Sequence, residues 1–246
     1  MEASMNATLI NLGIINWQST AKFYTTFFER KLYLNVLDGL QATLFLTAIA
    51  TVIGLIIGLI IATIQIVPFS DQFKFLGKIL KTIAVMYIDI IRGTPALVQV
   101  VFLYSVVFAN SNMSPLFIGG LAFGINSGAY MSELVRAGIQ GIDKGQMEAG
   151  RSLGISYATT MRYIILPQAF KNILPALVSE FIILIKETAV IGFIGGYDLM
   201  RSSDDMMSTT FNATQPLLIV AVIYLILTGA FTKVMRQVEK KTRLSD

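Results

Sequence analysis

Charged and amide side chains inside long apolar segments are the residues of this sequence whose types could do chemistry. Ionisable groups at membrane depth are costly, so they usually face other helices or water and mark the path of a solute. An amino-acid zwitterion needs an acceptor for its ammonium group and a donor for its carboxylate. The side chains that together offer such donors and acceptors are Arg92, Gln99, Asn126, Tyr130, Glu133, Glu180, Lys186 and Glu187.

Helical spacing predicts which of these side chains lie together. Asn126, Tyr130 and Glu133 recur at helical intervals, so they are predicted to share one face of a helix. Arg92 and Gln99 are seven residues apart, and this interval predicts a second shared face. The two faces therefore form the candidate pathway for a polar solute.

A structural role is the alternative for each of these residues. Glu133 could pair with Arg136, three residues later on the same helix. Arg92 could extend to the membrane interface, and Lys186 with Glu187 could hold two copies of the chain together. The sequence leaves both kinds of role open, and Glu133 is the preferred contact for a substrate ammonium group.

The composition places these residues in a membrane protein. Of the 246 residues, 54% are hydrophobic and 14% are charged, whereas a soluble domain carries about 25% charged residues. Cysteine and histidine are absent, so thiol chemistry and the commonest metal ligand are excluded. We expect an all-α, polytopic membrane protein with about five transmembrane helices and no metal site.

Five apolar segments are long enough, or nearly so, to cross a bilayer. They cover residues 40–67, 79–108, 115–135, 172–195 and 216–231. Gly93, Thr94 and Pro95 interrupt the second, so a broken helix is predicted there, with Thr94 as the N-cap and Pro95 as the first residue of the new helix. Gly54 and Gly58 in the first segment either mark a close helix contact or are glycines tolerated in lipid.

Lysine and arginine residues predict the orientation of the chain. Thirteen of them flank the segments on one side and four on the other, which places the N-terminus outside and the C-terminus in the cytoplasm. The predicted parts are an external or interfacial segment (1–38), a transmembrane domain (39–233) and a basic cytoplasmic tail (234–246). The expected location is a bacterial-type cell membrane.

One cytoplasmic stretch carries a spaced motif. It reads EAGRSLGISYATTMRYIILPQA, from 148 to 169. This resembles the coupling motif of permease subunits in ATP-binding-cassette importers, whose pattern is Glu-Ala-Ala, three residues, Gly, nine residues, Ile, one residue, Leu-Pro. The matching positions are Glu148, Ala149, Gly154, Ile164, Leu166 and Pro167, and Gly150 replaces the second alanine. The resemblance implies a coupling element at about 144–167 that docks in a groove on an ATPase subunit.

The sequence around the motif narrows the family. RGTPALVQ, GAYMSELVRAGI, KGQMEAG and LPQAFKNILPAL resemble the polar amino-acid branch, the histidine and glutamine permeases. The resemblance implies the fold of type I importer permeases. It also implies the partners: ATP-binding-cassette ATPase subunits that bind ATP and Mg, a second permease subunit, identical or related, and an external substrate-binding protein.

Two functions of other classes compete with an importer permease. Asp89, Glu133 and Glu180 would suit an ion-coupled secondary transporter, but the odd number of spans and the missing inverted repeat argue against it. A membrane scaffold without transport does not explain buried charges of both signs. The sequence has no GxxxxGK[ST] loop, so we expect no ATP hydrolysis and no cofactor in this chain.

Overall fold

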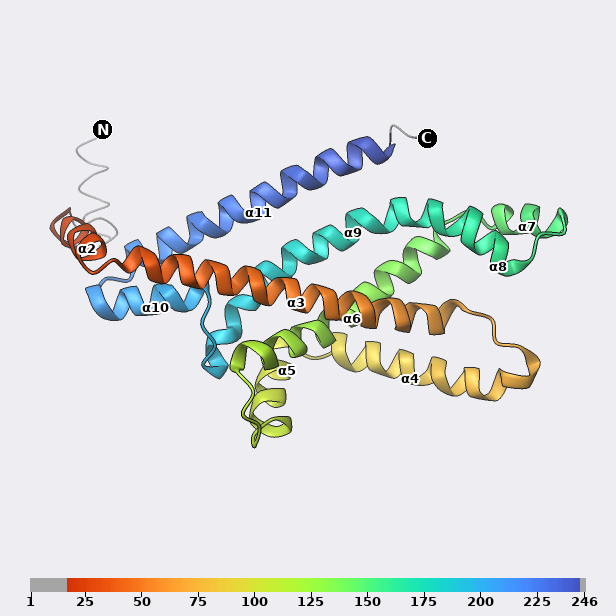
Figure 1. Ribbon diagram of the computed structural model, residues 1–246, viewed down its shortest axis with the longest axis horizontal. Helices are drawn as coiled ribbons and strands as arrows, with labels where there is room; N and C mark the ends of the chain where they lie inside the picture. The colour runs from red at the N-terminus through yellow and green to blue at the C-terminus, as the bar shows by residue number, and fades with distance from the viewer. Residues whose placement is uncertain (1–16, 244–246) are drawn as a thin grey trace.

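The chain is helical throughout the part that the structure describes. The computed structural model describes residues 17–243, which contain helices and turns and no strand (Figure 1). The predicted all-α class is confirmed. The α-helices are α2 (Trp17–Glu29), α3 (Leu32–Ile66), α4 (Lys74–Arg92), α5 (Ala96–Phe102), α6 (Pro115–Gln140), α7 (Lys144–Ser152), α8 (Tyr157–Thr160), α9 (Leu166–Glu187), α10 (Leu199–Thr210) and α11 (Thr214–Arg243).

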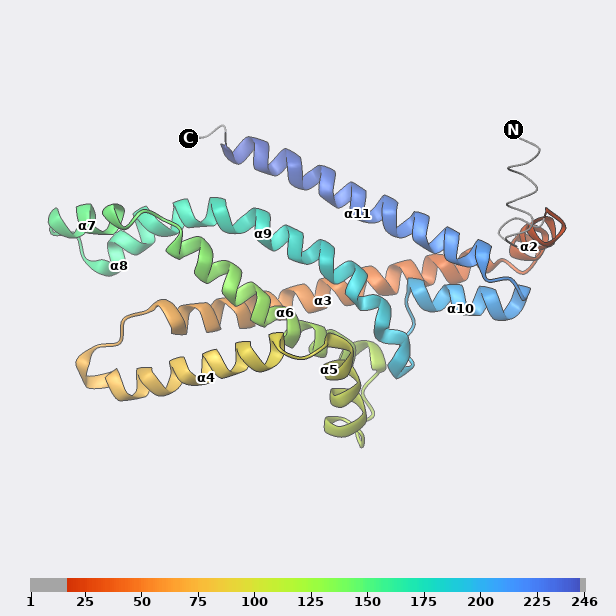
Figure 2. The same cartoon turned by 180° about the vertical axis from the view of Figure 1, so that it is seen from behind.

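The long helices run along the long axis of an elongated molecule. Both views show α3, α6, α9 and α11 in this direction, with α2 and α10 at one end (Figures 1 and 2). The short helices α7 and α8 and the turn between α3 and α4 lie at the opposite end, and α5 projects to one side. The predicted coupling element therefore lies at the opposite end of the molecule from α2 and α10.

Among the described residues, two helices are long and apolar enough to cross a membrane by composition alone, and the number rises to three if one bent pair of helices counts as a single span. The two are α3 and the 214–237 part of α11, and the bent pair is formed by α4 and α5. Helices α6 and α9 have 26 and 22 residues, which is enough to cross a bilayer. They carry more polar residues, and much of α6 is buried against other helices, so it does not need a lipid-facing apolar surface.

Several helix boundaries differ from the sequence-based expectations. Helix α3 begins at Leu32, so the expected boundary at residue 38 falls inside it. Helix α9 begins at Leu166 and ends at Glu187, where a 3₁₀ segment continues to Ile194. The predicted cap at the break is wrong by one residue: Pro95 is the N-cap of α5, because the hydroxyl of Thr94 donates backwards to the carbonyl of Ile90. Residues 1–16 and 244–246, parts of the expected terminal segments, lie outside the described range.

Glycines bring the backbones of α3 and α6 into direct contact. A Cβ at Gly54 would lie 3.1 Å from the Cβ of Ser127, and one at Gly58 would lie 2.8 Å from the Cβ of Met131. In the other direction, a Cβ at Gly124 would lie 2.6 Å from the side chain of Ile53. Of the two interpretations of Gly54 and Gly58, the close helix contact is confirmed.

A buried carboxyl group joins α10 to the end of α3. Asp198 is fully buried and caps α10, because its Oδ1 accepts a 2.8 Å hydrogen bond from the backbone N–H of Arg201. The backbone N–H of Leu199, the residue after Asp198, donates to the hydroxyl of Thr43 on α3. The Oδ2 atom of Asp198 has no hydrogen-bond partner among the described residues. Burial raises the pKa of Asp198 from 3.8 to about 6.

Replacing Asp198 should change how stability depends on pH. The unfolded carboxyl ionises near pH 3.8 and the folded one near pH 6, so wild-type stability falls as the pH rises between these values and stays lower above them. Asp198→Asn keeps an acceptor for the N–H of Arg201 but cannot ionise. We expect the melting temperature of the variant in detergent to exceed that of the wild type at pH 7, and the difference to shrink towards pH 4.

The control is Asp198→Ala, which removes the cap altogether. It should lower stability by about 1 kcal/mol relative to Asp198→Asn at every pH. A difference between wild type and Asp198→Asn that is the same at pH 4 and pH 7 would show that the carboxyl ionises normally in the fold.

Candidate functional site

The break between α4 and α5 lies at the centre of the candidate pathway. The two helices are bent by 104° over a short interval. Proline has no backbone N–H, so Pro95 cannot donate to the carbonyl of Ile91 four residues earlier. The side-chain amide of Gln99 supplies the missing donor: its Nε2 lies 2.8 Å from that oxygen and 2.7 Å from the hydroxyl of Thr94.

Gln99 also links the break to α6. Its Oε1 accepts a 3.0 Å hydrogen bond from Nδ2 of Asn126, a residue that is 4% exposed. The amide of Gln99 is therefore engaged at both its nitrogen and its oxygen. The expected shared face with Arg92 is wrong, because the bend interrupts the helical periodicity on which the prediction depended.

A charged cluster joins the end of α4 to α6. Glu133 accepts hydrogen bonds from Arg136 at both carboxylate oxygens, at 3.0 Å from Nε and 2.7 Å from Nη2. Nη1 of Arg92 lies 3.8 Å from the same carboxylate, and its guanidinium lies over the ring of Tyr130, 5.3 Å from the centroid. The predicted pairing of Glu133 with Arg136 is confirmed, and Arg136 donates further to Gln140.

The cluster is partly open, so it could meet a solute. The side chains of Arg92, Arg136 and Glu133 keep 44%, 32% and 24% of their exposure. Because two cations face one carboxylate, the cluster has an excess of positive charge that suits the carboxylate of a zwitterion. Of the sequence candidates, the structure brings Arg92, Tyr130 and Glu133 into this cluster and places Asn126 with Gln99 beside it.

Glu180 forms a separate site between α6 and α9. It is 7% exposed, and its Oε1 accepts a 3.0 Å hydrogen bond from the hydroxyl of Ser127. Ser127 is also the residue against which Gly54 packs, so the carboxylate lies where three helices meet. Lys186 and Glu187 lie at the end of α9, where Lys186 is exposed and Glu187 is half-buried. Among residues 17–243, no group of three or more carboxylates is arranged to hold a metal ion.

The coupling motif forms two short helices at one end of the molecule. Helix α7 begins after Asp143, whose side chain accepts a hydrogen bond from the N–H of Gly145. Gly150 is buried, and a Cβ there would lie 2.6 Å from the side chain of Thr160 on α8. The small residue at 150 therefore allows α7 to pack closely on α8.

Gly154 ends α7 in a left-handed turn. Its φ is +78°, a value that side chains rarely adopt, and the N–H of Ile155 donates back to the carbonyl of Gly150. Gly154 therefore makes a sharp turn at the end of the helix. Glu148, Ala149 and Gly154 are exposed, and Leu153 at the tip is 79% exposed. Ile164 lies in a π-helical turn that leads to Leu166 and Pro167 at the start of α9.

The sequence matches a family of transport proteins over most of its length. Residues 54–244 match the family described as "Binding-protein-dependent transport system inner membrane component". The chain belongs to this family. Membership in it decides against the ion-coupled secondary transporter and the scaffold.

Curated relatives of this inner membrane component are permease proteins. The arginine transport system permease protein of Bacillus subtilis is 40% identical over 166 residues, which cover 67% of this chain and 76% of the relative. The glutamine transport system permease protein of Escherichia coli K12 is 37% identical over 173 residues, covering 69% of this chain and 79% of the relative.

Solved structures share the architecture of this inner membrane component. The chain superimposes on the crystal structure of an amino acid ABC transporter with histidines, with a TM-score of 0.79 and 40% identity, covering 92% of this chain and 99% of the other. A methionine ABC transporter in an inward-facing conformation has a TM-score of 0.72 and 20% identity, covering 85% and 96%, and shows the same fold. The expected ABC importer permease fold is confirmed.

Sequence reasoning missed two features of this site. Ser127, the partner of Glu180, is a small hydroxyl residue without a distinctive motif, although it lies near the face of α6 that carries glycines. The exposed Leu153 was also missed, because it is not one of the fixed positions of the motif. An apolar side chain directly before a glycine turn, in an otherwise polar stretch, was the available signal.

Removing the amide of Gln99 should destabilise the break. Gln99→Met leaves the carbonyl of Ile91 without a donor, at a cost of about 1–3 kcal/mol. Pro95→Ala restores a backbone N–H four residues after Ile91 and so offers that carbonyl another donor. We expect Gln99→Met to lower the melting temperature by several degrees in the wild-type background and by less in the Pro95→Ala background.

A double-mutant cycle on the purified chain separates this role from others. Gln99→Glu has nearly the same shape but places oxygen against oxygen at Ile91, so it should be no better than Gln99→Met. Strictly additive effects of the substitutions at 95 and 99 would show that Gln99 does not compensate for the backbone N–H that Pro95 lacks.

Proposed function

We propose that this chain is the permease subunit of an ATP-driven amino-acid importer. The single observation that carries the proposal is the preformed element of α7 and α8, with an exposed tip at Leu153 and Gly154. The relatives named as arginine and glutamine permeases support a polar amino acid as substrate. The structure of the amino acid ABC transporter, similar over nearly the whole chain, supports the same class.

The proposed complex has three kinds of component. Two permease subunits, identical or related, enclose the pathway, and an external binding protein delivers the amino acid. Two ATPase subunits bind ATP and Mg, and this chain supplies only the surface on which one of them docks. ATP binding closes the ATPases and moves the element at 144–167, and the spans open outward; hydrolysis returns the path to its inward state.

The element contacts the ATPase through its exposed side chains. Glu148, Ala149, Leu153 and Gly154 face away from the bundle, whereas Gly150 faces inward. An apolar side chain at a polar tip is typical of an anchor that fills a pocket on a partner. We propose that Leu153 is this anchor. We propose that α7 and α8 lie in the cytoplasm and the N-terminus outside, and the lysine and arginine count supports this orientation.

Gly154→Trp tests the docking of the ATPase. Tryptophan is strained at φ +78° and adds a bulky ring at the tip, where the space around the glycine is open in this chain. The fold should survive, because the ring meets nothing within the subunit, but the ATPase should be lost on detergent purification and transport into vesicles should fall at least ten-fold.

A matched control separates strain from obstruction. Gly154→Asn adopts the left-handed conformation far more readily than tryptophan does and is small. It should retain most of the ATPase and most of the transport. Equal retention of the ATPase by the wild type and by Gly154→Trp would contradict docking at this turn, and with it the cytoplasmic placement of α7.

We propose that the cluster at Arg92 and Glu133 receives the amino acid. Supporting this role are its partial exposure, its position beside a broken helix, and its two signs of charge. Broken helices near mid-membrane offer free carbonyls and polar ends to substrates in transporters. Glu180 is the second choice, since its carboxylate is buried against Ser127 and is less accessible.

Glu133→Gln and Glu180→Gln distinguish the two sites. If Glu133 meets the ammonium group, Glu133→Gln removes a charge-assisted hydrogen bond of roughly 1.5–3 kcal/mol, and transport should fall about ten-fold or more while the complex still assembles. Glu180→Gln should leave transport closer to the wild-type level. Arg136→Gln is the control for the ion pair alone. It should have a large effect on the melting temperature and a small effect on transport. Normal transport by Glu133→Gln would leave the substrate site elsewhere.

A further inference from the structure

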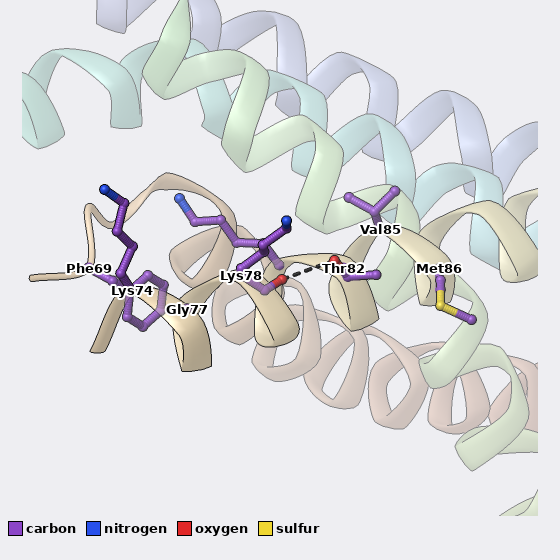
Figure 3. Close-up of a pocket in the computed structure, with 8 residues that line it drawn as sticks. Phe69, Lys74, Gly77, Lys78, Thr82, Val85 and Met86 are labelled. Carbon is purple, nitrogen blue, oxygen red and sulfur yellow. Dashed lines mark hydrogen bonds between the residues drawn. The ribbon is translucent and has the colours of Figure 1, made fainter. Parts of the chain in front are cut away.

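A groove along the first part of α4 combines three lysines with an apolar wall. Its volume is about 570 Å³, and Figure 3 shows the lining side chains along one side of the helix. Lys74, Lys78 and Lys81 line the part near the α3–α4 turn, and Val85 and Met86 line the part further along α4. The groove lies outside both the charged cluster and the coupling element.

The floor of the groove is built by Phe69 against Gly77. A Cβ at Gly77 would overlap the ring, so the glycine allows Phe69 to lie flat on the helix. The ammonium group of Lys81 lies 5.7 Å from the centre of this ring. This contact holds one of the cations beside an apolar surface.

The positive charges of the groove are largely uncompensated by carboxylates. Lys74 lies 4.0 Å from Asp71, but both side chains are more than four-fifths exposed, so this pair contributes little. Among the described residues, no carboxylate lies within ion-pair distance of Lys78 or Lys81. At least two positive charges of the groove are therefore available to attract an anion.

The dimensions of the groove match one leaflet of a bilayer. From Lys74 to Met86 the helix rises about 18 Å, and half of the hydrocarbon core is about 15 Å thick. The lysines lie towards the N-terminal end of α4, and the apolar wall lies further along the helix. Phe75 and Ile83, on the adjacent face of α4, are 78% and 56% exposed, which is typical of a surface in lipid.

We propose that this groove binds an anionic phospholipid of the membrane. The phosphate lies against Lys78 and Lys81, and one acyl chain follows Val85 and Met86. Charge complementarity favours the anionic head group, and continuity with the lipid-facing side of α4 favours a lipid over a protein partner. The inference goes beyond the proposed function and requires only that α4 lies in a membrane.

Equilibrium binding of a fluorescent phosphatidylglycerol to the full-length chain in detergent tests this site. Unlabelled phosphatidylglycerol should displace the probe, and phosphatidylcholine with the same acyl chains should displace it much less well. Glycerol phosphate, which carries the anion without acyl chains, should not displace it at the same concentration. Equal displacement by the two phospholipids would overturn the proposal.

Paired variants locate the binding. Lysine near a membrane surface contributes about 1 kcal/mol, or about five-fold, to the binding of anionic lipid, so Lys78→Gln with Lys81→Gln should weaken affinity about 25-fold. The control, Lys233→Gln with Arg236→Gln on α11, removes the same charge elsewhere and should leave affinity within about two-fold. Equal losses in the two pairs would reduce the effect to net charge and would contradict a built site.

A third variant tests the groove itself and keeps all three lysines. Val85→Trp fills the apolar part of the groove with a large ring and should weaken binding of phosphatidylglycerol at least five-fold. Wild-type affinity in this variant would mean that the lysines attract lipid without the groove, and the proposal would fail. Transport assays are not part of this test, so its outcome is independent of the importer function.

Discussion

The contact between the backbones of α3 and α6 is the constraint on which the rest of the structure depends. Gly54 and Gly58 of α3 meet Ser127 and Met131 of α6 so closely that a Cβ at either glycine would require the neighbouring atoms to shift. Lipid tails are as apolar as leucine side chains, so helices in a membrane gain more from such close packing than from the hydrophobic effect. With α6 held in this position, Asn126 reaches the break, Glu133 reaches Arg92, and Ser127 reaches Glu180.

At two irregularities of the bundle, a backbone group without a helical partner is satisfied by a nearby side chain. Pro95 frees the carbonyl of Ile91, and Gln99 supplies its donor. The turn before α10 places Asp198 where it caps the helix, and Thr43 accepts from the next N–H. In a medium of low dielectric an unpaired backbone group costs several kcal/mol, so irregular backbone persists only where such partners exist.

The membrane class, the break and the coupling turn could be predicted from the sequence because each depends on local properties. Long apolar runs, the missing N–H of proline and the positive φ of a glycine need no knowledge of the rest of the chain. The relation between Arg92 and Gln99 could not be predicted, because a 104° bend invalidates the helical interval that separates them. The start of α3 at Leu32 was also missed. Residues 32–39 mix Tyr33, Asn35 and Asp38 with apolar residues, so the sequence shows no continuous apolar run there. This part of the helix is stabilised by packing on α10 and α11. The roles of the pathway residues depend on a substrate and partners, which one chain does not contain.

The glutamine at the break gives the bent span a freedom that a continuous helix lacks. A bond of the helical ladder joins two backbone groups of fixed geometry, so turning one segment against the other breaks it. The bond from Gln99 runs through a side chain with rotatable torsions, so α5 can swivel about the residues Gly93 to Pro95 while the amide stays on the carbonyl of Ile91. The angle between the two halves of the span can then change without exposing an unpaired carbonyl to lipid. A rearrangement of this span would then be limited by the reach of Gln99 and by its hydrogen bond to Asn126 on α6, and not by the loss of a backbone hydrogen bond.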